Sequence, residues 1–327
     1  MSGSIVLGFD TSCYTTSVAA VTLEGDILCS CRRLLSVEQG QRGLRQSDAL
    51  FLHTRQLPVL MEEMAPSIRG MQVAAVCASS RPRDDESSYM PVFLAGDAQA
   101  RTLSAVLGIP FFHTTHQRGH FRAARVGTRL QDGPALFMHL SGGTTEILSC
   151  SADSLQLLGG SGDLHAGQLI DRTGVAMGLH FPAGPEVEKL AMEGWSEHRI
   201  PLSMDKVGIV CHLSGAETQV QRWLKFGTLS HEDIAAEVFD FLARTVSRMA
   251  LMAEKHTGIH QILIAGGVAS SSLLRDMVRN RVSRQSDLTV YFGKNELSGD
   301  NAVGVALIGR EKFLAERQGE HDVGSNS

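Results

Sequence analysis

The sequence predicts an α/β protein made of two similar lobes, each with a sheet covered by helices. One order of elements occurs twice along the 327 residues: three strands, a helix, a strand, a helix, a strand and a helix. The expected strands are short apolar runs, and the expected helices place apolar residues three or four apart. We assign the first lobe to residues 1–125 and the second to 126–318, with a helical insertion at about 184–225 and a polar tail at 319–327.

Three apolar strands separated by turns open the first lobe, at residues 5–9, 17–23 and 27–35. Apolar residues then recur at helical spacing until Ala65-Pro66 ends the pattern, which predicts a helix at 48–64. The remaining elements, in order, are a strand at 73–77, a polar surface loop at 79–88, a helix at 95–107 and a strand at 111–115 that runs into a helix.

The second lobe repeats this arrangement. Strands are expected at 135–140, 145–150 and 155–158, followed by a helix at 166–177. After the insertion come a helix at 234–256, a strand at 261–265, a helix from about Ser271, a strand at 288–292 and a helix at 301–317. The tail is predicted to be disordered because it is polar and offers little apolar surface to bury.

Composition limits the function classes. A formal net charge of -5 and a pI near 6.2 predict no broad basic surface, so contact with RNA would need a local patch or a partner. The six cysteines form no Cys-x-x-Cys pair, which favours reduced thiols and a cytoplasmic location. We expect no membrane span, because no apolar run reaches the roughly 18 residues that one requires.

Two histidines four residues apart follow the strand at 111–115. If a helix begins there, His116 and His120 lie one turn apart and can hold one metal ion. The alternative is a helix start with two partly exposed polar histidines. The best candidate for a third ligand is Asp300 at the start of the final helix, which would bring a carboxylate from the second lobe to a site between the halves.

Polar and glycine-rich turns follow several of the expected strands. The first strand ends in Asp10-Thr11-Ser12, which could face a phosphate or a metal-bound water, or could cap the turn. The pairs Gly142-Gly143 and Gly266-Gly267 each follow an apolar strand, and glycine lets the backbone approach an anion closely. The second pair also opens a helix, whose dipole favours negative charge. These turns predict a nucleotide site, although both could be simple turns.

Seven motifs occur in a specific order: Gly-Phe-Asp-Thr-Ser-Cys at Gly8, His-Gln-Arg-Gly-His at His116, Leu-Ser-Gly-Gly-Thr-Thr-Glu at Leu140, Asp-Leu-His-Ala-Gly-Gln-Leu-Ile-Asp at Asp163, Phe-Pro-Ala-Gly-Pro at Phe181, Ala-Gly-Gly-Val-Ala-Ser at Ala265 and Gly-Asp-Asn-Ala at Gly299. With them the chain resembles the threonylcarbamoyl-adenosine tRNA synthase family, formerly called O-sialoglycoprotein endopeptidases, over nearly its whole length. That family belongs to the superfamily of sugar kinases, Hsp70 and actin.

The resemblance implies an actin-like fold with a nucleotide cleft between its lobes, and an acyltransferase that moves threonylcarbamoyl from threonylcarbamoyl-adenylate to N6 of adenine in tRNA. It implies one divalent metal ion, iron or zinc, at His116, His120 and Asp300, with Asp10 and Ser12 as candidate catalytic residues. ATP or an acyl-adenylate would contact His139, Leu140, Ser141, Gly142, Gly143, Asp171, Gly184, Glu188, Gly266, Gly267 and Ser271. The implied partners are tRNA, helper subunits including a smaller paralogous protein, and a second copy in a homodimer.

Departures from the family cluster at the positions that would handle protons or the acceptor: Tyr14 and Thr15 replace acids, Arg118 and Glu217 reverse a charge, and Ser271 replaces an asparagine. Two alternatives therefore stay open, a transferase of the same fold with another acceptor and a non-catalytic nucleotide-binding partner. A metalloprotease is disfavoured, because Gln117 stands where zinc proteases carry the glutamate that acts as general base, and a glutamine side chain cannot accept that proton.

Overall fold

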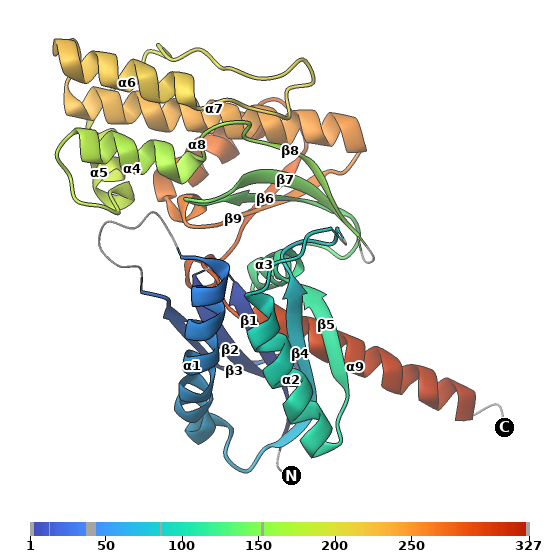
Figure 1. Cartoon of the computed structure of the whole chain (residues 1–327). Helices are drawn as coiled ribbons and strands as arrows, with labels where there is room; N and C mark the ends of the chain where they lie inside the picture. Colours follow the sequence, from blue (N-terminus) through green and yellow to red (C-terminus); the bar gives the residue numbers. More distant parts are fainter. Residues whose placement is uncertain (1–2, 13, 37–43, 86, 152–153, 325–327) are drawn as a thin grey trace. The chain divides into compact units, whose positions relative to one another are not determined.

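The computed structural model describes residues 3–12, 14–36, 44–85, 87–151 and 154–324 (Figure 1). The described chain divides into two compact units. One contains the chain up to Ala123 together with the part from Asp300 onward, and the other contains Ala124–Gly299. Each unit has a five-stranded sheet, ordered β3-β2-β1-β4-β5 in the first and β8-β7-β6-β9-β10 in the second. Because the two orders correspond strand for strand, the predicted duplicated α/β fold is confirmed.

The first sheet is built around its first strand. β1 (Ser4–Ser12) pairs antiparallel with β2 (Thr15–Thr22), which pairs antiparallel with β3 (Ile27–Leu34). On its other side β1 pairs parallel with β4 (Gln72–Arg81), and β4 pairs parallel with β5 (Phe111–Thr115). The carboxyl ends of three parallel strands therefore lie at one edge of this sheet, where polar side chains that follow them can meet.

Alternation along β1 decides which helix covers which face. The helices of this unit are α1 (Gln46–Met64), η1 (Ala65–Ile68), α2 (Phe93–Leu107), α3 (His116–Ala124) and α9 (Val303–Gly324). Ile5, Leu7 and Phe9 are fully or nearly buried in one core with residues of α1 and α2. Gly8 points to the opposite face, where a Cβ atom would lie 2.5 Å from the backbone nitrogen of Ala306 in α9. The sheet is thus covered by α1 and α2 on one side and by α9 on the other (Figure 1).

The second unit repeats the sheet and adds more helices. Its strands are β6 (Ala135–Leu140), β7 (Thr145–Cys150), β8 (Leu155–Gly160), β9 (Gln261–Ala265) and β10 (Thr289–Phe292). Its helices are α4 (Ala166–Ala176), α5 (Gly184–Glu193), α6 (Ser214–Phe226), α7 (His231–Thr257), η2 (Val268–Ser270), α8 (Ser272–Val282) and η3 (Asn295–Leu297). The long helix α7 lies at the centre of the core, and most of its residues are buried. Ser230 caps its start by accepting from the N–H of Asp233, and Gly258, in the left-handed conformation, ends it.

Four expectations differ from the structure. The surface loop expected at 79–88 begins later, because β4 continues to Arg81 and Ser79 is fully buried. The tail expected to be disordered is helical through Gly324, and residues 325–327 lie outside the described residues. The insertion at 184–225 contains α5 and α6 with a long non-helical stretch between them. The final helix, assigned to the second lobe, packs on the first sheet instead.

Two further expectations concern composition. The cysteines within the described residues are free thiols, and Cys13 lies outside those residues. In the described part of the chain, no helix is both long and apolar enough to cross a membrane.

Candidate metal centre and nucleotide site

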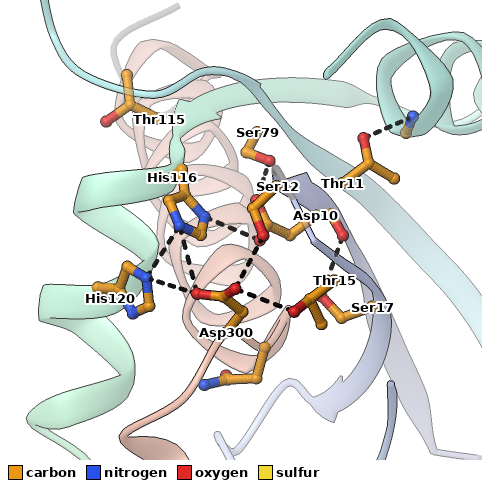
Figure 2. Close-up of polar contacts among 12 residues, drawn as sticks. Asp10, Thr11, Ser12, Thr15, Ser17, Ser79, Thr115, His116, His120 and Asp300 are labelled. Atoms are coloured by element: carbon orange, nitrogen blue, oxygen red, sulfur yellow. Dashed lines mark hydrogen bonds and ion pairs between the residues drawn. The ribbon is translucent and has the colours of Figure 1, made fainter. Parts of the chain in front are cut away.

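Two imidazoles and one carboxylate converge at the carboxyl ends of β1 and β5 (Figure 2). His116 begins α3, His120 lies one turn later, and Asp300 precedes α9. The Nε2 atoms of the imidazoles are 2.9 Å apart, and Oδ1 of Asp300 lies 3.6 Å from that of His116 and 3.3 Å from that of His120. The expectation that the carboxylate comes from the second lobe is wrong, because all three residues belong to the first unit.

The donor atoms fit a divalent transition metal. One ligand atom from each residue lies within 4.8 Å of the other two. Ligands bound 2.0–2.2 Å from one tetrahedral ion lie roughly 3.3 Å from one another, so only small movements separate this arrangement from coordination. Imidazole nitrogen suits zinc and iron, and three protein ligands leave coordination positions open for a substrate.

A second layer of polar groups orients the three candidate ligands. Nδ1 of His116 lies 2.9 Å from Oδ2 of Asp10, which directs Nε2 of the same ring toward the other ligands. The buried Ser79 donates to the other oxygen of Asp10. Ser12 and Thr15 both donate to Oδ2 of Asp300, at 3.2 and 3.0 Å, and leave Oδ1 facing the imidazoles. Asp10 and Ser12 therefore lie beside the candidate ligands, and a catalytic role for them stays a prediction. Ser79 was not predicted at this site, because residues 79–88 were expected to form a surface loop.

The two carboxylates, Asp10 and Asp300, stabilise positive charge on the histidines of this cluster. Burial disfavours a charged imidazole, but the charge of Asp10, its hydrogen bond and the charge of Asp300 outweigh this effect and raise the pKa of His116 to about 9. Burial also opposes ionisation of Asp300, yet the hydrogen bond from His120 and the charges of both histidines lower the pKa of this carboxyl well below its usual range. A divalent cation binding here would displace the proton of His116.

Glycines let the two helices that carry the ligands approach closely. A Cβ atom at Gly304, in the first turn of α9, would overlap the carbonyl oxygen of Gly119 in α3 and would lie 2.8 Å from the backbone nitrogen of Ala123. Gly119 is the glycine between the two histidines. Contact of backbone with backbone at this point brings the start of α9, and with it Asp300, beside α3.

The cationic Arg118 beside the histidines has a specific partner. Nε of Arg118 lies 2.9 Å from each carboxylate oxygen of Asp84, and Nη2 lies 2.6 Å from Oδ2. Asp84 also accepts from the hydroxyl of Thr115 at 2.9 Å, and the N–H of Gln117 donates to the carbonyl of Pro82. The segment after β4 is therefore tied to the first turn of α3, and the charge of Arg118 is neutralised there.

Replacing Asp84 by asparagine is expected to weaken cation binding by about tenfold, the lower end of what loss of an outer-shell partner costs. The variant leaves Arg118 without its carboxylate beside the ligands and loosens the first turn of α3. Calorimetric titration with Zn²⁺ or Co²⁺ measures the effect. Asp85→Asn is the matched control, because the carboxylate of Asp85 accepts from the N–H and hydroxyl of the neighbouring Ser87, and no described contact joins it to α3. Equal affinities of the two variants would contradict this role of Asp84.

The two predicted glycine turns lie side by side in the second unit. β6 pairs parallel with β9, so both strands end at the same edge of the sheet. A Cβ atom at Gly266, which has a φ of 109°, would overlap the carbonyl oxygen of Leu140 at the end of β6. Gly142, Gly143 and Gly267 have no heavy atom within 4 Å of such a Cβ position. The turns thus offer open backbone on neighbouring strand ends, as a phosphate requires.

The other predicted nucleotide contacts connect the elements around these turns. A Cβ atom at Gly167 in α4 would meet the backbone of Gly142 at 2.7 Å. Asp171 in α4 accepts from the N–H of Ala183, just before Gly184 begins α5. Glu188 in α5 accepts from the N–H of Leu273 and the hydroxyl of Ser272 at the start of α8. The polar residues carried over from the resemblance therefore have structural bonds of their own.

Two further predicted contacts complete the set. Ser271 caps α8 by accepting from the N–H of Leu274 at 3.1 Å. His139 is the second-last residue of β6, just before Leu140 and Ser141. Its ring stacks against that of Phe137, with the two centroids 6.1 Å apart. Both residues lie next to the glycine turns in the chain, and their contact with a ligand stays a prediction.

Comparison with known proteins agrees with these features. A model of the family "TsaD: tRNA N6-adenosine threonylcarbamoyltransferase" matches residues 89–307. A tRNA N6-adenosine threonylcarbamoyltransferase of Thermotoga neapolitana is 30% identical over 316 residues, which cover 94% of either chain. The predicted acyltransferase class is thereby confirmed.

Solved structures support the fold. Full-length HypF in a phosphate- and nucleotide-bound form superposes with a TM-score of 0.62 at 13% identity, covering 95% of this chain and 46% of HypF. A glucokinase of the ROK family from Streptomyces griseus, solved with glucose and AMPPNP, has a TM-score of 0.54 at 13% identity and covers 94% of this chain and 99% of its own. The predicted sugar-kinase-like fold is confirmed, and with the match to the family model it follows that the chain belongs to the TsaD family of tRNA N6-adenosine threonylcarbamoyltransferases.

Proposed function

We propose that this chain transfers a threonylcarbamoyl group from threonylcarbamoyl-adenylate to N6 of an adenine in tRNA, with one divalent cation, iron or zinc, held by His116, His120 and Asp300. The observation that carries the proposal is the convergence of these three ligand atoms in a member of the TsaD family. In the reaction the N6–acyl bond forms, the bond between the acyl carbon and the bridging phosphate oxygen breaks with release of AMP, and the N6 proton passes to the AMP phosphate or to water. The cation would supply Lewis acidity at the acyl carbonyl or at the leaving phosphate.

The chain's own residues position this chemistry. Asp10 is fully buried and both its oxygens are engaged, by Ser79 and His116, so we assign it to holding the imidazole rather than to accepting a substrate proton. Ser12 and Thr15 fix the rotation of the Asp300 carboxylate. Thr15, which stands at a position where the family usually has an acid, thus has a defined task in the proposed centre.

Recognition of the adenylate is proposed for the second unit. The backbone at Gly142, Gly143 and Gly267 would receive phosphate, since no heavy atom lies within 4 Å of a Cβ position there and glycine turns at the ends of strands let an anion approach closely. Asp171 and Glu188 lie on the helices that border these turns, and we propose that they contact ribose or base. ATP is the simplest ligand with which to test this part of the proposal.

A transferase with a different acceptor is the second candidate. It is favoured by two ion pairs at positions that depart from the family: Arg118 pairs with Asp84, and Glu217 pairs with Arg172 at 3.2 Å. Both would change the surface that an acceptor meets while leaving the proposed metal ligands as they are. A non-catalytic partner has less support, because a protein without chemistry has no need of the oriented Asp10, Ser12 and Thr15.

The deciding experiment combines purified protein with synthetic threonylcarbamoyl-adenylate and unmodified tRNA, with and without the helper subunits of a host that makes this modification. Nucleoside mass spectrometry should detect N6-threonylcarbamoyladenosine, and the Asp300→Ala variant should give none. Complementation of a strain depleted of its own synthase tests the same activity in cells. If the wild-type protein consumes the adenylate but leaves tRNA unmodified, the second candidate replaces the first. If it does neither, the proposed transfer is wrong.

A further inference from the structure

A cavity of about 260 Å³ lies within the second unit, among the end of α5, the first half of α7 and the face of α8 that packs against α7. Its walls are apolar and include Phe239, Leu273 and Met277. Trp195 lines it as well, although its side chain is 72% exposed. Asp240 and Arg281 line the cavity together with His198 and give it a polar part. Apolar walls combined with a few convergent polar groups are typical of a small-ligand site.

Acidic residues on α7 fix the backbone of the segment that carries Trp195. Oδ1 of Asp233 accepts from the N–H of Trp195 at 2.8 Å. Glu237, one turn later and fully buried, accepts from the N–H of Glu197 at 2.7 Å and from that of Arg199 at 2.9 Å. An exposed indole on a fixed backbone loses little conformational freedom when a planar group stacks on it.

His198, between the two residues held by Glu237, has a backbone conformation that L residues rarely adopt. Its φ is 61°, and among the described residues it is the one non-glycine position with a positive φ. Such strain persists only where the surroundings impose it, and it concentrates at functional sites. Nδ1 of His198 lies 2.7 Å from Oδ2 of Asp240, which leaves Nε2 on the outer side of the ring.

The buried carboxylate of Asp240 contacts two guanidinium groups and one imidazole. Asp240 is 1% exposed and contacts Nε of Arg244 at 2.7 Å, a guanidinium nitrogen of Arg281 and the imidazole of His198. Arg244 is also committed to the carbonyl of Ile200. Arg281 and His198 line the cavity, and each has N–H or ring nitrogen positions beyond the one that Asp240 uses. Arg281 can therefore donate hydrogen bonds to a ligand, and Nε2 of His198 can accept one, because Nδ1 carries the proton that faces Asp240.

We propose that this cavity binds a nucleotide, with its base stacked on Trp195, an acceptor atom met by the guanidinium of Arg281 and an N–H group of the base met by Nε2 of His198. A base has a flat apolar face for the indole and carries both acceptor atoms and N–H donors at its edge, and its size suits one small cavity. The ligand is either a free mononucleotide or an unpaired nucleotide of RNA. The proposed adenylate contacts and the metal ligands do not line the cavity, so the inference does not depend on the proposed function.

Fluorescence of Trp195 tests the proposal directly. The chain has two tryptophans, and the other, Trp223, is 8% exposed. In the full-length Trp223→Phe variant, titration with AMP, GMP, CMP, UMP and a single-stranded RNA decamer should quench the Trp195 emission to saturation. Saturation by a mononucleotide identifies a free nucleotide as the ligand, and saturation by the decamer alone identifies RNA. The Asp171→Asn variant, which alters a proposed adenylate contact outside the cavity lining, should bind equally well, and this separates the cavity from the proposed adenylate site.

Affinity measurements on the Trp223-containing chain provide the second test. Anisotropy of a labelled decamer, or competition by mononucleotides, should show a Kd raised roughly tenfold by Trp195→Ala, within the range for loss of one stacked base. Phe226→Ala is the matched control, because Phe226 is an aromatic residue of the same unit, 67% exposed and outside the cavity lining. The proposal is overturned if no probe changes the Trp195 emission at millimolar concentration, or if the two alanine variants bind alike.

Discussion

Alanine at any one of His116, His120 or Asp300 is expected to abolish stoichiometric binding of a divalent cation, and with it the transfer reaction. Each side chain supplies one of three ligand atoms that lie within 4.8 Å of one another, and two remaining ligands would hold an ion only weakly. The loss should exceed about 100-fold in affinity, which is the most that removal of an outer-shell partner usually costs. Metal analysis of each variant after gel filtration measures the occupancy.

A histidine on β5, the strand that precedes α3, provides the control for this series. His113 lies three residues before His116, its side chain is half exposed, and its Nε2 pairs with Asp97 at 2.6 Å. His113→Ala should therefore retain a full complement of metal. Full occupancy in one of the three ligand variants would remove that residue from the ligand set and leave the other two in need of a different partner.

Alanine at Gly304 is expected to have the second large effect, on stability and on the metal centre together. The added methyl group would overlap the carbonyl oxygen of Gly119, and neither backbone segment can yield as a flexible side chain would. Overpacking of this kind costs about 3 kcal/mol or more in the free energy of unfolding. Because the displaced segments carry both histidines and Asp300, cation affinity should fall as well. Urea unfolding and calorimetry measure the two quantities.

The same helix supplies the matched control. Gly319 lies in α9, is exposed, and has no heavy atom within 4 Å of the position of a Cβ atom. Alanine there should leave cation affinity unchanged and should stabilise the helix by roughly 0.5–1 kcal/mol, because glycine is a poor helix former. A Gly304→Ala protein as stable as wild type would mean that α3 and α9 are not packed backbone to backbone.

Much of the fold and the pairing of two of the three candidate metal ligands could be predicted from local sequence. The spacing of His116 and His120 fixes their relation because a helix places residues four apart on one face. The pairs Gly142-Gly143 and Gly266-Gly267 could be recognised because each directly follows an apolar strand, and the parallel pairing of β6 with β9 then brings the turns together. In each case the informative residues are close in sequence or lie at the ends of strongly patterned strands.

The rest depends on contacts between distant segments. Asp300 joins the first unit because α9 crosses back to the first sheet, and no periodicity within α9 specifies which sheet it covers. Arg118 is neutralised by Asp84, which lies 34 residues earlier in the chain. A partner so distant in sequence cannot be recognised from local pattern, so the sequence shows only a cation beside the candidate ligands. The last residues of β4 are polar, and a polar run after an apolar strand predicts a loop. Ser79 is nevertheless buried within β4, where its hydroxyl donates to Asp10.

The return of α9 to the first sheet has a consequence for biosynthesis. Ribosomes release the N-terminal strands first, and domains usually fold as they emerge. Here Gly8, on that face of β1, is covered by a helix that is translated after the whole second unit. A polypeptide that stops before residue 300 would expose an apolar surface of the first sheet and would lack the carboxylate of Asp300. We expect chaperones to bind such an exposed apolar surface.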